Sequence, residues 1–124
     1  MPSEPDKVSL VFPKERKLAR PAEFSRVKEE GSTHRWTHLV LGLLECPENE
    51  AFRAGFVTSK RVGGAVVRNR VRRRLREIVR LHQRRIRPEI WFVLIARPSS
   101  AHASYAQLED DWLRLAKRAF ILAP

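Results

Sequence analysis

The side chains that most often carry catalysis or bind metals are few in this chain and do not converge on a known arrangement. The four histidines (His34, His38, His82, His102) are scattered, and none has the spacing to Cys46 or to a carboxylate that a metal site needs. The carboxylates of residues 109–111 could form an acid–base pair. They fall, however, in the first turns of a predicted helix, where acids favour the helix dipole. We therefore expect no catalytic residue in the protein itself, and the sequence leaves the metal-contacting residues open.

Arginine is the residue type whose positions do predict a binding chemistry. The chain carries a net charge of +11, and the segment from Lys60 to Arg87 holds twelve basic residues but a single acid, Glu77. The rest of the chain contains equal numbers of basic and acidic residues. The positive charge is therefore a local patch, and a local basic patch is typical of a protein that binds a polyanion.

The same segment should form a helix. Its apolar residues recur at helical spacing: Val67, Val71, Leu75 and Ile78. Five pairs of arginines then lie four residues apart on its surface, and each pair costs roughly 0.2–0.5 kcal/mol. The usual interpretation of a charged helix face is a solvated surface, but such a face normally includes glutamates. Arginine also pairs with phosphate oxygens through two hydrogen bonds. These features favour a nucleic acid as the partner and do not distinguish RNA from DNA.

Two further helices and three strands are predicted around this segment. The predicted helices cover residues 21–30, 66–86 and 105–120, and the predicted strands cover residues 36–46, 52–60 and 90–96. The first two strands should form a hairpin, and the wholly apolar third strand should lie at the centre of the sheet. Ser104 is a candidate cap for the last helix. The order α-β-β-α-β-α is typical of an α+β fold, here a two-layer sandwich in which a small sheet packs against helices.

The length suits a single domain, which we assign to residues 14–124 after a flexible N-terminal arm, residues 1–13, that contains three prolines. The longest apolar runs are far too short to cross a membrane, and the first residues lack the apolar core of a signal peptide. A single cysteine fits a reducing compartment. We therefore expect a cytoplasmic protein with no membrane partner.

The stretch SKRVGGAVVRNRVRRRLREIVR, residues 59–80, closely resembles the signature of the protein subunit of bacterial ribonuclease P. The resemblance extends from Lys17 to Phe120 and includes the pair EF at residues 23–24 and the stretch LIARP at residues 94–98. It implies the element order given above, with a left-handed βαβ crossover that runs against the usual right-handed rule.

The resemblance also implies a function. In this family the protein assists an RNA subunit, which removes the 5′ leader of precursor tRNA with bound Mg²⁺, so that the RNA carries the chemistry of the endoribonuclease. The expected partners are therefore ribonuclease P RNA and precursor tRNA, with no further protein required.

Two sets of site residues follow from the resemblance, position by position. The surface for the catalytic RNA should comprise Lys60, Arg61, Arg68, Asn69, Arg70, Arg72, Arg73 and Arg76. A cleft between the first helix and the sheet should receive the single-stranded leader, and its expected residues are Phe24, Lys28, Ser59 and Arg97. Lys28 and Gly42 stand where family members carry further aromatic residues, so this cleft should rely more on charge. Whether Trp36 or His38 replaces the missing aromatics is open.

Two other functions fit the charge pattern. Another basic RNA-binding or ribosomal protein would share the patch but would not act selectively on leader-bearing precursor tRNA. A basic amphipathic helix could instead bind an anionic membrane or an acidic protein, although the core needs the apolar stripe of this helix.

Overall fold

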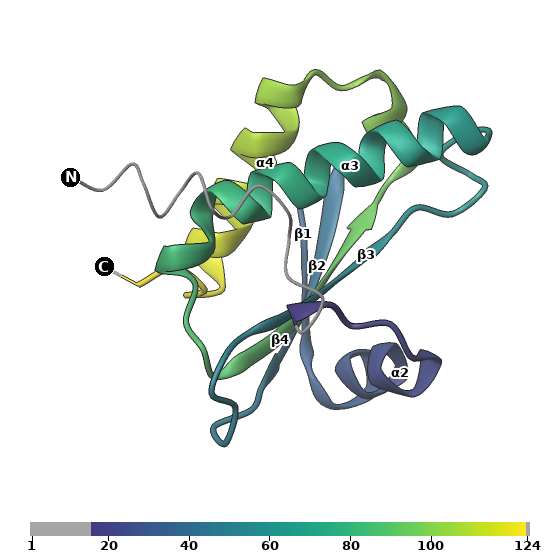
Figure 1. Ribbon diagram of the computed structural model, residues 1–124. Coiled ribbons are helices and arrows are strands. Elements are labelled where there is room, and N and C mark those ends of the chain that lie inside the picture. The colour runs from purple at the N-terminus through teal and green to yellow at the C-terminus, as the bar shows by residue number, and fades with distance from the viewer. Residues whose placement is uncertain (1–15, 124) are drawn as a thin grey trace.

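The computed structural model describes residues 16–123, so the predicted N-terminal arm, residues 1–13, lies outside the described residues. The helices are α2 (Pro21–Glu30), α3 (Ala65–His82) and α4 (Tyr105–Arg118), with short 3-10 helices η2 (Gln83–Arg85) and η3 (Pro98–His102). The strands are β1 (Ser32–Arg35), β2 (Leu39–Glu45), β3 (Arg53–Val57) and β4 (Ile90–Ala96). Figure 1 shows the sheet between α2 on one side and α3 with α4 on the other. The α+β class is confirmed, and α2 adds a partial third layer to the predicted two.

The strands form one mixed sheet in the order β1-β2-β4-β3. β4 pairs antiparallel with β2 and parallel with β3, so it lies inside the sheet, as its apolar sequence predicts. The predicted hairpin of residues 36–46 and 52–60 is wrong, because β4 lies between β2 and β3. A wholly apolar strand is most stable where both of its faces are covered, and β4 meets that need, because Phe92 and Leu94 pack in the core cluster on one face and Val93 in the cluster on the other.

β1 is a strand that the sequence analysis did not predict, so the predicted order α-β-β-α-β-α lacks one element. Its four residues have no apolar alternation, and three of them are exposed. The strand forms at the edge of the sheet through antiparallel pairing with β2. Gly31 joins it to α2 at a point where the backbone of Leu43 leaves no room for a side chain.

Two clusters of buried side chains lie on the two faces of the sheet. The larger cluster joins the sheet to α3 and α4 and includes Leu75, Phe92 and Trp112, with the two rings stacked at a centroid distance of 5.3 Å. The smaller cluster lies beneath α2 and includes Val27 and Cys46. Burial raises the pKa of the Cys46 thiol, as is typical of an unreactive cysteine in a core.

The helix ends agree with the residue types found there. Pro21 occupies the first turn of α2, and the hydroxyl of Ser104 accepts a hydrogen bond from the backbone N–H of Gln107 at 3.1 Å, which confirms the predicted cap of α4. α3 ends at His82 and continues as η2, so the α-helix is shorter than the predicted 66–86. In the part of the chain that the structure describes, no helix is long and apolar enough to span a membrane.

Candidate nucleic-acid interface

α3, the long teal helix in Figure 1, covers one face of the sheet, so one side of the helix packs on the core and the opposite side faces away from it. Val71 and Leu75 are fully buried against the core. Helical geometry then turns Asn69, Arg73 and Arg76 outwards, where all three are exposed. The structure therefore confirms the predicted division of this helix into an apolar stripe and a polar face.

The arginines on the two flanks of α3 are held by neutral oxygen atoms of the protein. Arg70 and Arg74 donate to backbone carbonyl oxygens of η3 and of the residue that follows it, at 3.0 and 3.2 Å. On the other flank, Arg72 donates to the hydroxyl oxygen of Thr58 at 2.5 Å and to the side-chain carbonyl oxygen of Asn69 at 3.1 Å. These contacts orient the guanidinium groups without neutralising their charge.

Most ion pairs of the basic segment lie towards its carboxyl end. Arg80 pairs with Glu77 at 2.6 Å, and Arg87 pairs with the carboxylate that ends β2 at 2.9 Å. Within residues 16–123, no carboxylate forms an ion pair with an arginine between positions 68 and 76. Arg76 is exposed as a residue, but its guanidinium lies over the Phe56 ring at 6.0 Å, and this partial burial, together with the neighbouring charge of Arg72, lowers its pKa. The first half of α3 therefore has a charge that the described part of the protein does not neutralise.

The connection from β3 to α3 adds cations and backbone donors at the start of the helix. Lys60 and Arg61 are exposed in this turn. Gly63 has a φ angle of 153°, which residues with side chains rarely adopt. Gly64 then precedes the helix and offers no side chain to the N–H groups of the first turn. An anion at this end of α3 would meet both these N–H groups and the two cations.

A groove of about 350 Å³ lies between α2 and the sheet. Its lining residues are Phe24, Val27, Lys28, Thr33, Arg35, Val40, Gly42, Val57, Val93 and Ile95. Phe24 and Lys28 therefore line a cleft at the predicted place. Ser59 and Arg97 are not among the lining residues; each lies two positions beyond a lining residue, past the ends of β3 and β4.

Thr33 and Arg35 are groove residues that the sequence analysis missed. They reach the groove because β1 pairs with β2 and places Thr33 beside Gly42 and Arg35 beside Val40. No local pattern in the sequence predicts β1. The sequence therefore contains no signal that identifies Thr33 and Arg35 as part of a site.

The packing of α2 on β3 fixes the position of Phe24. A Cβ atom on Gly55 would lie 2.6 Å from Cε1 of the Phe24 ring, so the glycine makes room for the ring. Next to it, Arg53 donates to the carboxylate of Glu23 at 2.6 Å. Burial acts to raise the pKa of Glu23, but hydrogen bonds from two backbone N–H groups at the start of α2 and from Arg53 outweigh it, and the pKa is lowered. This ion pair therefore holds α2 against the sheet beside the groove.

Trp36 and His38 lie away from the groove. Trp36 packs against the larger core cluster, and the guanidinium of Arg118 lies over its ring at 4.9 Å. The backbone N–H of His38 donates to the buried carboxylate of Asp111 at 2.6 Å, which ties the turn after β1 to α4. Neither residue lines the groove, so in this structure neither takes the place of the missing groove aromatics.

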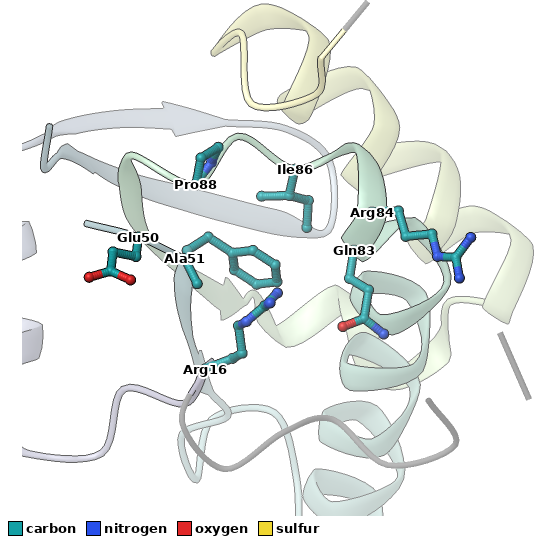
Figure 2. Close-up of a pocket in the computed structure, with 8 residues that line it drawn as sticks. Arg16, Glu50, Ala51, Gln83, Arg84, Ile86 and Pro88 are labelled. Atoms are coloured by element: carbon teal, nitrogen blue, oxygen red, sulfur yellow. The ribbon is translucent and has the colours of Figure 1, made fainter. Parts of the chain in front are cut away.

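A second hollow, of about 320 Å³, lies at the carboxyl end of α3 (Figure 2). Arg16, labelled in Figure 2, lies over the ring of Phe52, whose centroid is 4.7 Å from the guanidinium carbon. The Phe52 side chain is only 1% exposed, and Glu50 adds a negative charge to the lining. This hollow therefore offers no open stacking face and no uniformly positive lining for a nucleic acid.

Several of the histidines and carboxylates described in residues 16–123 take part in contacts within the protein. Asp110 pairs with Arg114 at 2.8 Å, and His82 lies 3.2 Å from the carboxylate of Glu109. In this part of the chain, no group of three or more His, Cys, Asp or Glu side chains is placed to hold a metal ion. The described residues thus offer binding surfaces, and the surface with the strongest charge is that of α3.

Comparison with known proteins shows what the chain as a whole is similar to. The family model described as ribonuclease P matches residues 12–120. The chain is 42% identical over 107 residues to the ribonuclease P protein component of Chloroflexus aurantiacus, covering 86% of this chain and 78% of that protein. It is 36% identical over 111 residues to that of Halalkalibacterium halodurans, covering 90% and 93%. A solved structure of a Staphylococcus aureus RNase P protein mutant with defective mRNA degradation activity superposes with a TM-score of 0.82 at 26% identity, covering 88% of this chain and 92% of that one.

Proposed function

The chain belongs to the ribonuclease P protein family, and on that basis we propose that it binds ribonuclease P RNA through α3 and the 5′ leader of precursor tRNA through the groove beside α2. The family role is the maturation of tRNA 5′ ends. In this arrangement the surface of α3 and the groove beside α2 bind different RNA molecules.

The observation that carries the proposal is the uncompensated charge of α3. Arginines between positions 68 and 76 repel one another, and none forms an ion pair with a carboxylate in the described residues. A folded RNA would supply the missing negative charge along the helix. The guanidinium groups of Arg70, Arg72 and Arg74 are already oriented by neutral acceptors, so less conformational entropy is lost when phosphates bind.

The groove supports binding of a single strand. Stacking of a base on an aromatic side chain is worth roughly 1–3 kcal/mol, and Phe24 is the aromatic residue that lines the groove. The aliphatic residues beside it suit the unpaired bases and sugars of a leader. A precursor would thereby bind more tightly than the mature tRNA, which has no leader to place there.

We further propose that the RNA subunit carries the chemistry and holds the Mg²⁺ ions. The metal would activate the attacking water and stabilise the leaving oxygen when bound. The carboxylates described in residues 16–123 do not converge on a metal site, so the residues of this chain act by binding and orienting RNA. We place the complex in the cytoplasm, with no other protein required.

Reconstitution of the full-length protein with a ribonuclease P RNA tests this proposal. At a Mg²⁺ concentration that leaves the RNA alone nearly inactive, adding the protein should restore cleavage at the tRNA 5′ end, whereas the protein alone should cleave nothing. Affinities for leader-bearing and leaderless tRNA should also differ. A protein that bound both tRNAs equally and did not affect cleavage would instead be a general RNA-binding protein.

A further inference from the structure

The charges that line the groove are all positive. Lys28 comes from α2 and Arg35 from β1, and both side chains are exposed. The other eight lining residues carry no charge, and no acid is among them. Neither cation takes part in an ion pair in the described part of the chain. A ligand of this groove is therefore expected to carry negative charge.

The pairing of β1 places Arg35 on the groove side of the sheet. Arg35 lies beside Val40, and Thr33, two residues earlier, lies beside Gly42. All four residues line the groove, as strand alternation requires for positions two apart. Arg35 is also the last residue of the edge strand β1, so it lies at the rim of the groove lining.

The uncharged part of the lining is mostly aliphatic. Val40, Val57, Val93 and Ile95 contribute branched side chains, and Gly42 contributes none. With Phe24 as the aromatic residue of the lining, bases have one ring on which to stack. Much of the attraction for a nucleic acid must then act on its phosphates, and the groove offers two cations for that purpose.

We propose that Arg35 is a further leader-binding residue, which pairs with a phosphate of the single-stranded leader at the β1 rim while Lys28 pairs with another beside α2. This assignment rests on the proposed function of the groove. It adds a phosphate contact from an edge strand, and it explains how a groove with a single aromatic residue retains a single strand.

The test is equilibrium binding of precursor tRNA to the reconstituted complex, with wild-type protein, Arg35→Ala, Arg35→Lys and the control Lys117→Ala. Lys117 is an exposed cation of α4 that does not line the groove. Arg35→Ala should weaken precursor binding roughly two- to fivefold, the effect of one exposed ion pair. It should also reduce the salt slope by about 0.7, the value for one phosphate of a single strand. Arg35→Lys should restore the slope, and leaderless tRNA should bind all four proteins equally.

Two results would overturn the assignment. One is an Arg35→Ala protein that binds precursor like Lys117→Ala. The other is an equal loss for precursor, for leaderless tRNA and for the RNA subunit, shown by a variant with the wild-type Tm, which would place Arg35 in the general RNA interface. A wild-type complex that failed to distinguish precursor from leaderless tRNA would instead refute the proposed function of the groove itself.

Discussion

Arg70 and Arg73 allow the binding role of α3 to be separated from its structural role. Replacing either residue with alanine removes one positive charge from α3. Arg73 is exposed, whereas Arg70 is half-buried and donates to the carbonyl oxygen of Ala101 at 3.0 Å. We therefore expect Arg73→Ala to change RNA binding alone and Arg70→Ala to change both RNA binding and stability.

The expected magnitudes differ enough to be measured. Each lost phosphate contact lowers the salt slope by about 0.9, so the advantage of the wild type over either variant should shrink about 3.5-fold between 50 and 200 mM salt. Loss of a hydrogen bond to a charged group costs about 1.5–3 kcal/mol when buried. Two effects reduce this cost for Arg70. The residue is partly exposed, and Arg70→Ala relieves its repulsion with Arg74, which is worth about 0.2–0.5 kcal/mol. We therefore expect Arg70→Ala to lower the free energy of unfolding by about 1 kcal/mol. That corresponds to a fall in Tm of about 4 °C.

Filter binding to the ribonuclease P RNA over a salt series, combined with thermal unfolding of the free protein, measures both quantities. Lys117→Ala is the control, because it removes one charge outside α3. A wild-type salt slope for Arg73→Ala would refute the claim that the outward face of α3 binds phosphates. An equal fall in Tm for the two arginine variants would refute the structural distinction between them.

The remaining predictions concern α2 and its contact with β3. Phe24→Ala should weaken precursor binding by about 1–3 kcal/mol and leave the affinity for the RNA subunit unchanged; an equal loss for both would contradict a leader contact. Gly55→Ala should displace the Phe24 ring, whose Cε1 would lie 2.6 Å from the new Cβ, and should weaken precursor binding in the wild-type background but not in Phe24→Ala, as a double-mutant cycle would show. Because the folded-state pKa of Glu23 lies below the ordinary value of 4.5, its carboxylate stabilises the protein above that pH, and this stability is lost as the pH falls through the folded pKa. Urea unfolding at a series of pH values should therefore show a smaller loss of stability on acidification for Glu23→Gln than for the wild type, and identical pH profiles would contradict the ion pair with Arg53.

The features of α3 could be predicted from the sequence because they are local. Helical spacing places Val71 and Leu75 on one side, and the same spacing fixes Arg73 on the other, whatever the helix packs against. The cap at Ser104 is local in the same sense, since it depends on the backbone N–H of a residue three positions later. Such features need no knowledge of the tertiary fold.

The arrangement of the strands could not be predicted in this way, because strand pairing is non-local. The sequences of β2 and β3 are compatible with a hairpin, and only the competition with β4 for the same edges excludes it. β1 has no apolar pattern of its own and exists through its pairing with β2. The missed strand is also the reason why Arg35 was not a candidate site residue.

Ser59 and Arg97 lie beyond the same end of the groove but take different positions relative to α3. β3 and β4 are parallel neighbours, so their carboxyl ends lie at the same end of the sheet. Val57 and Ile95 line the groove at this end. Ser59 and Arg97 each follow two positions later along the chain, and the turn that leads to α3 begins after Ser59. Ser59 therefore lies between the groove beside α2 and the start of α3, which are on different faces of the sheet. Arg97 is turned the other way, because its guanidinium donates to the backbone carbonyl oxygen of Trp36 at 2.8 Å, in the turn between β1 and β2. Under the proposed function, an RNA chain that leaves the groove at this end towards α3 would pass Ser59 before it reaches the arginines of the helix.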